Sequence, residues 1–452
     1  MSNLAAAAPP DVKTATTHPI GFYFFFWGEF AERCSYYGMR AILPLYLTTV
    51  LKFDDGAATQ TYSLFKSACY FLPLLGGFLA DRLFGKYRTI VTFSIPYLIG
   101  QFLLLVPSQG ALLVALVLLA GGSGVIKPNI STLMGLTYDQ QRPGQLALRT
   151  SAFQWFYFSI NIGSLLSLFA LPIIREKVIA ATGDAVLAYR VAFSIPAFFM
   201  FCALIAFASG KKHYAVDTID RSTQTPEQKA LRWKTLARLF GVFGLVVFFW
   251  LAYEQNDNLW VFFARDHMDR RLFGYEFAPD GFQYLNAFLV LVFIPVFDFV
   301  FRKLDPEVKV FRPTVKMLIG LIATALSAGV MATAASLAAG GDKVTAWWIV
   351  LAYVVLTFGE VLLYGTGLEL AFSAAPASMK SFVTACFLIT NAVANLINSQ
   401  LSPHYGKTLS PQSYFTVTMF VTLLASVAFY FVGKQFNRAP AEPPPEPAGG
   451  AT

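Results

Sequence analysis

The segment 28–43, GEFAERCSYYGMRAIL, places four ionisable side chains in an otherwise apolar run. These are Glu29, Glu32, Arg33 and Arg40. Each charge would cost about 2.5–3.5 kcal/mol at the centre of a bilayer. On a helix these side chains, Tyr36 and Tyr37 share an arc of about 140°. Such a stripe facing a wet cavity can bind a proton and a charged solute, or its charges can pair locally and simply hold helices together.

The composition indicates a polytopic membrane protein. The chain is 56% hydrophobic and 13% charged, whereas soluble domains carry about 25% charged residues. We attribute the net charge of +8 to loop cations that set orientation, and expect the lipid bilayer rather than nucleic acid as partner. The four cysteines, Cys34, Cys69, Cys202 and Cys386, have no metal-ligand or disulfide spacing and are interpreted as small hydrophobic residues.

Apolar runs of about 20 residues, the length of a membrane span, predict an all-α protein with twelve spans. The predicted spans are 20–50, 58–80, 88–107, 111–135, 150–174, 187–209, 238–264, 281–301, 314–337, 345–374, 381–401 and 411–433. No cleavable signal peptide is visible before the first span. An even number of spans places both termini on the same side of the membrane. On that side the tails and loops hold 21 of the 34 lysines and arginines, and the loops on the other side hold nine. This bias predicts cytoplasmic termini and a location in the cell inner (plasma) membrane.

The longest polar break, residues 210–235, follows the sixth span. Two six-helix bundles joined by a basic linker are typical of the major facilitator fold, which binds substrate near the midplane between its halves. The expected organisation is a disordered cytoplasmic tail 1–19, a bundle 20–209, a linker 210–237, a bundle 238–433 and a disordered tail 434–452.

The stripe of the first span resembles the signature ExxERFxYYG of the proton-dependent oligopeptide transporter family, with Cys34 where the family has phenylalanine. Further segments are similar to family helices two, four, five, seven, eight and ten, in the expected order. They are GGFLADRLFGKYRTI (76–90), GGSGVIKPN (121–129), FQWFYFSINIGSLLS (153–167), FWLAYEQNDNLW (249–260), FQYLNAFLVLVFIPVF and FGEVLLYGTGLEL.

The resemblance implies a proton-coupled symporter that imports di- and tripeptides by alternating access. We expect no enzymatic activity, no cofactor besides the proton gradient, no metal, and a monomer. Arg33 and Lys127 would hold the peptide carboxylate, and Glu360 its amino group. The other peptide-binding residues implied are Tyr37, Tyr70, Asn161, Asn286 and Phe387. Asn161 can instead be a simple tie between helices.

Proton coupling is expected from a set of six ionisable residues. They are Glu29, Glu32, Arg33, Arg40, Lys127 and Glu254. The ammonium of Lys127 needs an acidic neighbour, for which Glu32 or Glu29 is the natural candidate. The family pattern further implies a proton-dependent pair between Glu254 and Arg40 in an outer gate.

Some positions depart from the family pattern. Residues 363–365 are Leu-Tyr-Gly where Leu-Ser-Pro is usual, and Phe387 replaces a common tryptophan. Lys66 and Glu369 are additional charges, which either are solvated at helix ends or enter the cavity and modify the site.

Three other functions are alternatives to peptide transport. The first is a proton-coupled transporter of another small solute, such as nitrate or a drug-like amine or carboxylate. A nitrate carrier would not need the amine-binding carboxylate of Glu360. A membrane-embedded enzyme lacks support because the sequence has no zincin motif, nucleophile elbow or intramembrane histidine pair. A passive channel fits paired acids in two half-bundles less well than alternating access does.

Overall fold

The computed structural model describes residues 17–216, 226–304, 310–373 and 380–438. The first half of the chain forms one bundle of long helices. Its elements are α1 (Ile20–Thr49), α2 (Asp55–Leu79) with the π-helical turn η1 (Ala80–Phe84), α3 (Lys86–Leu103), α4 (Gln109–Gln141), α5 (Leu146–Thr182), and α6 (Ala185–Ser209) with the 3-10 turn η2 (Gly210–His213).

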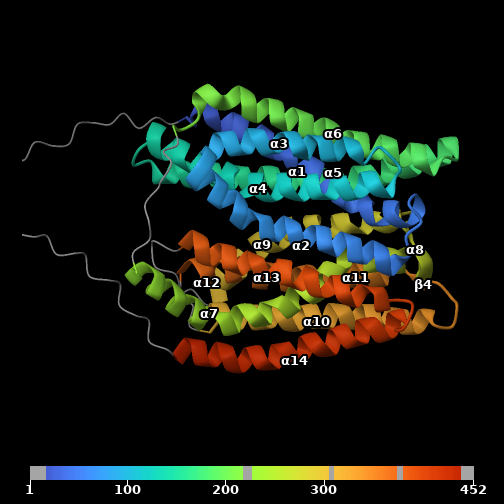
Figure 1. Ribbon diagram of the computed structural model, residues 1–452. Helices are drawn as coiled ribbons and strands as arrows, with labels where there is room; N and C mark the ends of the chain where they lie inside the picture. Colours follow the sequence, from blue (N-terminus) through green and yellow to red (C-terminus); the bar gives the residue numbers. More distant parts are fainter. Residues whose placement is uncertain (1–16, 217–225, 305–309, 374–379, 439–452) are drawn as a thin grey trace, which may run out of the picture.

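The second half forms the other bundle. Its helical elements are α7 (Pro226–Tyr253), η3 (Glu254–Asp257), α8 (Leu259–His267), η4 (Pro279–Gln283), α9 (Tyr284–Leu304), α10 (Pro313–Ala338), α11 (Trp347–Glu360), η5 (Val361–Gly365), α12 (Thr366–Ser373), α13 (Lys380–Leu401), η7 (Ser402–His404) and α14 (Pro411–Arg438). Helices α3 to α6 occupy the upper part of Figure 1, and α7, α10 and α14 the lower part. Helix α2 packs against α13, and α5 packs against α9, where the two halves meet.

Short strands lie at one end of the molecule, which we call the hairpin end. Strand β1 (Met268–Asp269) pairs in parallel with β4 (Val344–Thr345), and β2 (Arg271–Leu272) pairs antiparallel with β3 (Tyr275–Glu276). The opposite end, where α1 begins and α14 ends, is called the terminal end and is on the left in Figure 1.

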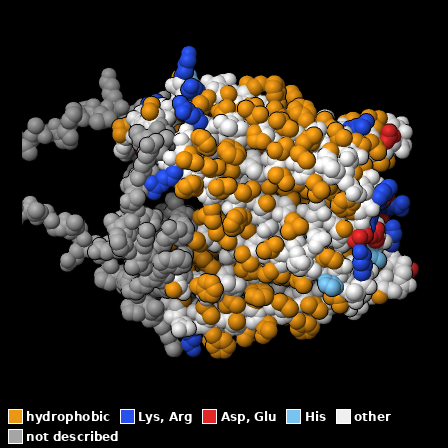
Figure 2. Space-filling view, in the orientation of Figure 1, with side chains coloured by type: hydrophobic (Ala, Val, Ile, Leu, Met, Phe, Trp, Pro, Cys, Tyr) orange, Lys and Arg blue, Asp and Glu red, His pale blue; other side chains and the backbone are white. Residues whose placement is uncertain are grey.

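Apolar side chains cover the flank of the molecule between these two ends. Figure 2 shows hydrophobic atoms across the middle, with most charged atoms at the ends. Nine helices of the described residues are long and apolar enough to cross a membrane. Helix α1 is not among the nine, although it matches a predicted span, because its four charges lower its hydropathy.

Small residues let neighbouring helices approach closely, as is common in membrane bundles. A Cβ atom added to Gly320 of α10 would lie 2.6 Å from the carbonyl oxygen of Gly359 in α11. The reciprocal distance, from Gly359 to the oxygen of Gly320, would be 2.7 Å. The two backbones are therefore in direct contact.

The structure corrects two predicted segments. Helix α7 begins at Pro226, inside the predicted linker 210–237, because proline suits the first position of a helix. The predicted span 238–264 is interrupted by the 3-10 turn η3. The predicted span 345–374 matches the continuous candidate span Trp347–Ala371, in which the π-helical turn η5 contains the Leu-Tyr-Gly departure from the family pattern. Residues 217–225 of the predicted linker, 1–16 of the predicted tail 1–19 and 439–452 of the predicted tail 434–452 lie outside the described residues.

Candidate functional site

Two carboxylates and one guanidinium are buried together on α1, and we call Glu29, Glu32 and Arg33 the α1 cluster. Arg33 Nε lies 3.0 Å from Glu29 Oε1, and Arg33 also pairs with Glu32. Each of the three residues is no more than 2% exposed. Within the described part of the chain, Glu29 Oε2 and Glu32 Oε1 have no hydrogen-bond partner. When fully ionised, the cluster thus carries one more negative than positive charge.

Glycines hold the α1 cluster tightly against α5 and α6. A Cβ atom on Gly28 would lie 2.4 Å from the Phe207 ring, and one on Gly163 would lie 2.9 Å from the carbonyl oxygen of Phe30. Cys34, which replaces the family phenylalanine, is fully buried, and its Sγ donates to the Gly163 carbonyl at 3.5 Å. The smaller cysteine fits this close contact between α1 and α5.

Lys127 lies within electrostatic range of Glu29 and Glu32, as predicted, but among the described residues it forms no ion pair with either. Its side chain is exposed on α4, and its Nζ lies 5.5 Å from the centre of the Tyr70 ring on α2. Among the ion pairs of the described residues, none joins Lys127 to Glu29 or Glu32, so that predicted pairing is not formed here. The reason is local: Arg33 already pairs with both carboxylates.

Glu360 and Asn286 come together in the second bundle. Asn286 of α9 donates to Glu360 Oε2 at 2.6 Å and to Thr357 Oγ1 at 3.1 Å. The hydroxyl of Tyr253 donates to Asn286 Oδ1 at 3.4 Å. Glu360 is half-buried, and no described lysine, arginine or histidine forms an ion pair with it.

Four charged residues form a buried network between the bundles, and we call Arg40, Lys66, Glu254 and Asp257 the hairpin-end cluster. Arg40 pairs with Asp257 at 3.2 Å, and Lys66 pairs with Glu254 and, at 2.6 Å, with Asp257. The predicted pair between Arg40 and Glu254 is therefore replaced by these three pairs. Glu254 pairs with the ammonium of Lys66 instead, and Arg40 pairs with the nearby carboxylate of Asp257.

Asp257 was missed by the sequence reasoning. It follows Glu254 by three residues in the quoted motif YEQND, so both carboxylates lie in the single 3-10 turn η3. That spacing was the available signal. Lys66 is fully buried rather than solvated, whereas Glu369 is exposed on α12.

The predicted peptide-contacting residues have different environments. Tyr37 and Tyr70 are half-buried, and the guanidinium carbon of Arg40 lies 4.9 Å from the centre of the Tyr37 ring. Asn161 is 8% exposed and donates to the carbonyl oxygen of Tyr157 in its own helix at 2.8 Å. A peptide contact of Asn161 therefore stays a prediction.

Phe387 does not line an open site in this structure, contrary to the prediction. Its ring is fully buried, with its centre 5.6 Å from that of Phe243 and 6.2 Å from that of Tyr364. A Cβ atom on Gly367 would lie 2.4 Å from this ring. The absence of a side chain at Gly367 lets Phe387 pack into the second bundle, next to Tyr364.

Further polar contacts hold the two bundles together at the hairpin end. Arg265 of α8 lies 2.8 Å from Asp55 of α2, and Lys407 lies 3.0 Å from Asp54. The backbone N–H of Ala57 and the ion pair with Lys407 lower the pKa of Asp54. Asp54 therefore stays ionised at neutral pH. The stability that its ion pair contributes to the folded state is lost as the pH falls through that lowered pKa.

Arg175 of α5 and Asp280 of η4 form a second buried tie between the bundles. Arg175 donates to Asp280 Oδ1 at 3.0 Å, and the two side chains are no more than 1% exposed. We predict that Arg175→Met destabilises the protein by about 3–5 kcal/mol because it leaves a buried carboxylate unpaired. Thermal unfolding in detergent measures this effect. The double variant Arg175→Met/Asp280→Leu should recover most of the loss, and a single variant as stable as wild type would contradict the prediction.

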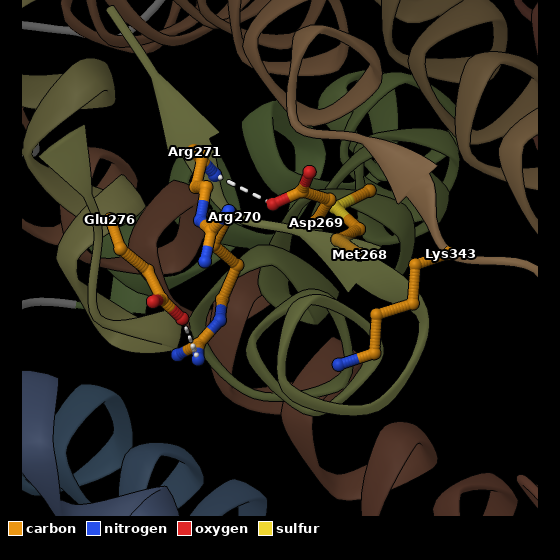
Figure 3. A pocket seen from close by; sticks show the side chains of 6 residues that line it. All are labelled: Met268, Asp269, Arg270, Arg271, Glu276 and Lys343. Carbon is orange, nitrogen blue, oxygen red and sulfur yellow. Dashed lines mark hydrogen bonds and ion pairs between the residues drawn. The ribbon is translucent and has the colours of Figure 1, made fainter. Parts of the chain in front are cut away.

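A shallow pocket at the hairpin end is separate from these clusters (Figure 3). It is lined by Met268, Asp269, Arg270, Arg271, Glu276 and Lys343. Arg270 pairs with Glu276 at 2.7 Å, and the backbone N–H of Arg271 donates to Asp269 at 3.2 Å. None of the residues predicted from the sequence lines it, so we do not assign it to the candidate site.

The fold and these buried charge clusters define a multi-pass helical membrane protein built from two bundles. A sequence model of the POT family matches residues 87–233 and 218–417. The chain belongs to the POT family, which is a family of transporters.

Similar proteins agree with this assignment. The mouse (Mus musculus) solute carrier family 15 member 2 is 34% identical over 378 residues, which are 72% of this chain and 50% of the relative. The uncharacterized transporter YclF of Bacillus subtilis is 28% identical, over 91% of this chain and 93% of its own. A crystal structure of a peptide transporter POT in complex with sulfate matches with a TM-score of 0.81 and 25% identity, over 94% of this chain and 96% of its own. The chain spans about half the length of the mouse relative.

Proposed function

We propose that this protein is a proton-coupled symporter that imports di- and tripeptides by alternating access. The observation that carries the proposal is a pair of opposite charges on different bundles. Lys127 on α4 and Glu360 on α11 each lack an ion-pair partner among the described residues. A short peptide is a zwitterion, so its carboxylate and ammonium can neutralise both.

The similar proteins support this substrate class. The solved structure matched above is that of a peptide transporter. In our proposal, Arg33 and Lys127 bind the peptide carboxylate, and Glu360 binds the amino group. Tyr37, Tyr70, Asn161 and Asn286 contact the peptide backbone.

The α1 cluster is the proposed proton site. Its two carboxylates share one guanidinium, so a proton on Glu32 or Glu29 balances its charge, and unbalanced buried charges are costly. Protonation also weakens the hold on Arg33, which is then free to bind the substrate carboxylate. An inward potential favours the entry of positive charge by about 2.3 kcal/mol per charge per 100 mV.

Alternating access requires that the bundles separate at one end at a time. In this structure, polar contacts join them at the hairpin end, through the hairpin-end cluster, Arg175–Asp280 and Arg265–Asp55. We propose that this end faces outward and that the termini are cytoplasmic in the plasma membrane. The nine candidate spans, together with α1, α3 and α13, give the proposed twelve passes. One chain supplies every named residue, so we propose a functional monomer.

Competition of uptake by end-blocked dipeptides tests this proposal. The purified protein is reconstituted in proteoliposomes with an imposed inward proton gradient, and uptake of labelled dialanine is measured. We expect unlabelled dialanine to compete, N-acetyl-dialanine and dialanine amide to compete at least about tenfold more weakly, and nitrate not to compete. Equal competition by the blocked and free dipeptides would contradict the assignment of Lys127 and Glu360.

A further inference from the structure

Lys66 lies in the contact between the two bundles, on the side of the hairpin end. Its side chain is fully buried on α2. Next to it, Ser67 donates to the carbonyl oxygen of Ala392 on α13 at 2.9 Å. The contacts of Lys66 therefore form or break as the bundles close or separate at this end.

The ammonium of Lys66 touches two carboxylates of the opposite bundle. It pairs with Glu254, and its Nζ lies 2.6 Å from Asp257 Oδ2. The remaining oxygens are also engaged: Asn391 donates to Glu254 Oε1 at 2.7 Å, and Arg40 lies 3.2 Å from Asp257 Oδ1. Each of the four carboxylate oxygens thus has a side-chain partner within the protein.

The hairpin-end cluster is electrically balanced. Two cations, Arg40 and Lys66, face two carboxylates, Glu254 and Asp257. Phenols and a thiol also face this cluster, namely Tyr62, Tyr70 and Cys69 on α2, Tyr36 and Tyr37 on α1, Tyr253 on α7 and Tyr353 on α11. The carboxylate of Glu360 is within electrostatic range of Asp257 and Arg40 but forms no ion pair with the cluster. A balanced cluster is the condition under which buried ion pairs are tolerated. The α1 cluster, with two carboxylates and one guanidinium, lacks this balance.

We propose that Lys66 is a built-in counter-charge that replaces a coupling proton on Glu254, so that closure at the hairpin end does not require proton uptake. Lys66 is then a positioning residue that acts through Glu254 and Asp257. The consequence for transport, which rests on the proposed function, is that proton coupling belongs to the α1 cluster and not to Glu254.

The net charge of the hairpin-end cluster in each variant predicts how closure at this end changes with pH. Lys66→Gln leaves one buried carboxylate unbalanced, so the closed state takes up a proton and closure becomes less favourable as the pH rises. Glu254→Gln leaves one buried ammonium unbalanced, so the closed state releases a proton and closure becomes more favourable as the pH rises. The double variant Lys66→Gln/Glu254→Gln keeps the Arg40–Asp257 pair and is balanced again.

A distance measurement between the bundles tests this inference without any substrate. Nitroxide labels are attached to bio-orthogonal side chains at exposed positions 182 and 342, which lie at the hairpin end of each bundle. Pulsed electron spin resonance then gives the closed fraction in nanodiscs between pH 5 and pH 8. The four native cysteines stay in place.

The expected result is a difference between variants. In Lys66→Gln, the closed-to-open ratio should fall, relative to wild type, by up to about tenfold for each unit of rising pH. This is the limit for one proton that binds only to the closed state. Glu254→Gln should add a change of opposite sign, and the double variant should match wild type. Identical pH dependence in wild type and both single variants would overturn the inference. If Lys66→Gln does not fold, the sign of the Glu254→Gln effect decides. Failure of peptide uptake, by contrast, would overturn the proposed function and leave this measurement interpretable.

Discussion

Glu32→Gln is expected to abolish proton-driven accumulation of dialanine while preserving exchange of dialanine across the membrane. Glutamine keeps the size of the side chain but cannot be ionised, so the α1 cluster retains the single pair between Arg33 and Glu29. Without a second carboxylate, the cluster neither binds nor releases a coupling proton. A gradient of one pH unit is worth 1.36 kcal/mol per proton. The accumulation ratio driven by it should therefore fall from as much as about tenfold to unity.

The measurement compares two assays on the same proteoliposomes. Uphill uptake is driven by an inward pH gradient, and exchange is followed as counterflow of labelled against unlabelled dialanine. Glu369→Gln is the matched control, because this carboxylate is exposed on α12 and lies outside the clusters. Full uphill uptake by Glu32→Gln would contradict the role of the α1 cluster.

Glu360→Gln is expected to weaken dipeptide binding strongly and selectively. Removing one partner of a desolvated charge pair typically costs about 2–5 kcal/mol. We therefore expect the KM for dialanine to rise by at least about thirtyfold. The amide of glutamine can still bond to Asn286, which now donates to Glu360 at 2.6 Å, so the local packing is preserved.

End-blocked peptides separate a charge effect from a general defect. N-acetyl-dialanine has no ammonium, so its weak uptake should be unchanged by Glu360→Gln. Lys127→Gln should show the converse pattern, with dialanine impaired and dialanine amide unaffected. An equal loss of blocked and free dipeptides in Glu360→Gln would indicate a structural role for the residue instead.

Much of the site could be predicted because each motif lies within one helix. The stripe on α1 follows from helical periodicity, and Glu29, Glu32 and Arg33 do lie buried together. Asn286 and Glu360, taken from separate motifs, are also brought together by α9 and α11. Here the resemblance supplied what periodicity cannot, namely which distant segments meet.

The errors concern partners chosen by tertiary packing. Direct ion pairs were expected between Lys127 and Glu29 or Glu32, and between Arg40 and Glu254. Helical periodicity does not reveal that Arg33 pairs with both carboxylates of its own helix, or that Lys66 crosses to Glu254. The predicted environment of Phe387 was wrong for a similar reason. The space over Gly367 that receives its ring forms only when α12 and α13 pack together.

Proton-driven uptake of dialanine by the wild-type protein tests the central claim most directly. Labelled dialanine is offered to proteoliposomes with an inward pH gradient, with no gradient, and with a gradient collapsed by a protonophore. The account predicts accumulation above the external concentration with the gradient alone, and equilibration in the other two conditions. Saturable entry that never exceeds the external concentration, or no entry of dialanine, would contradict it.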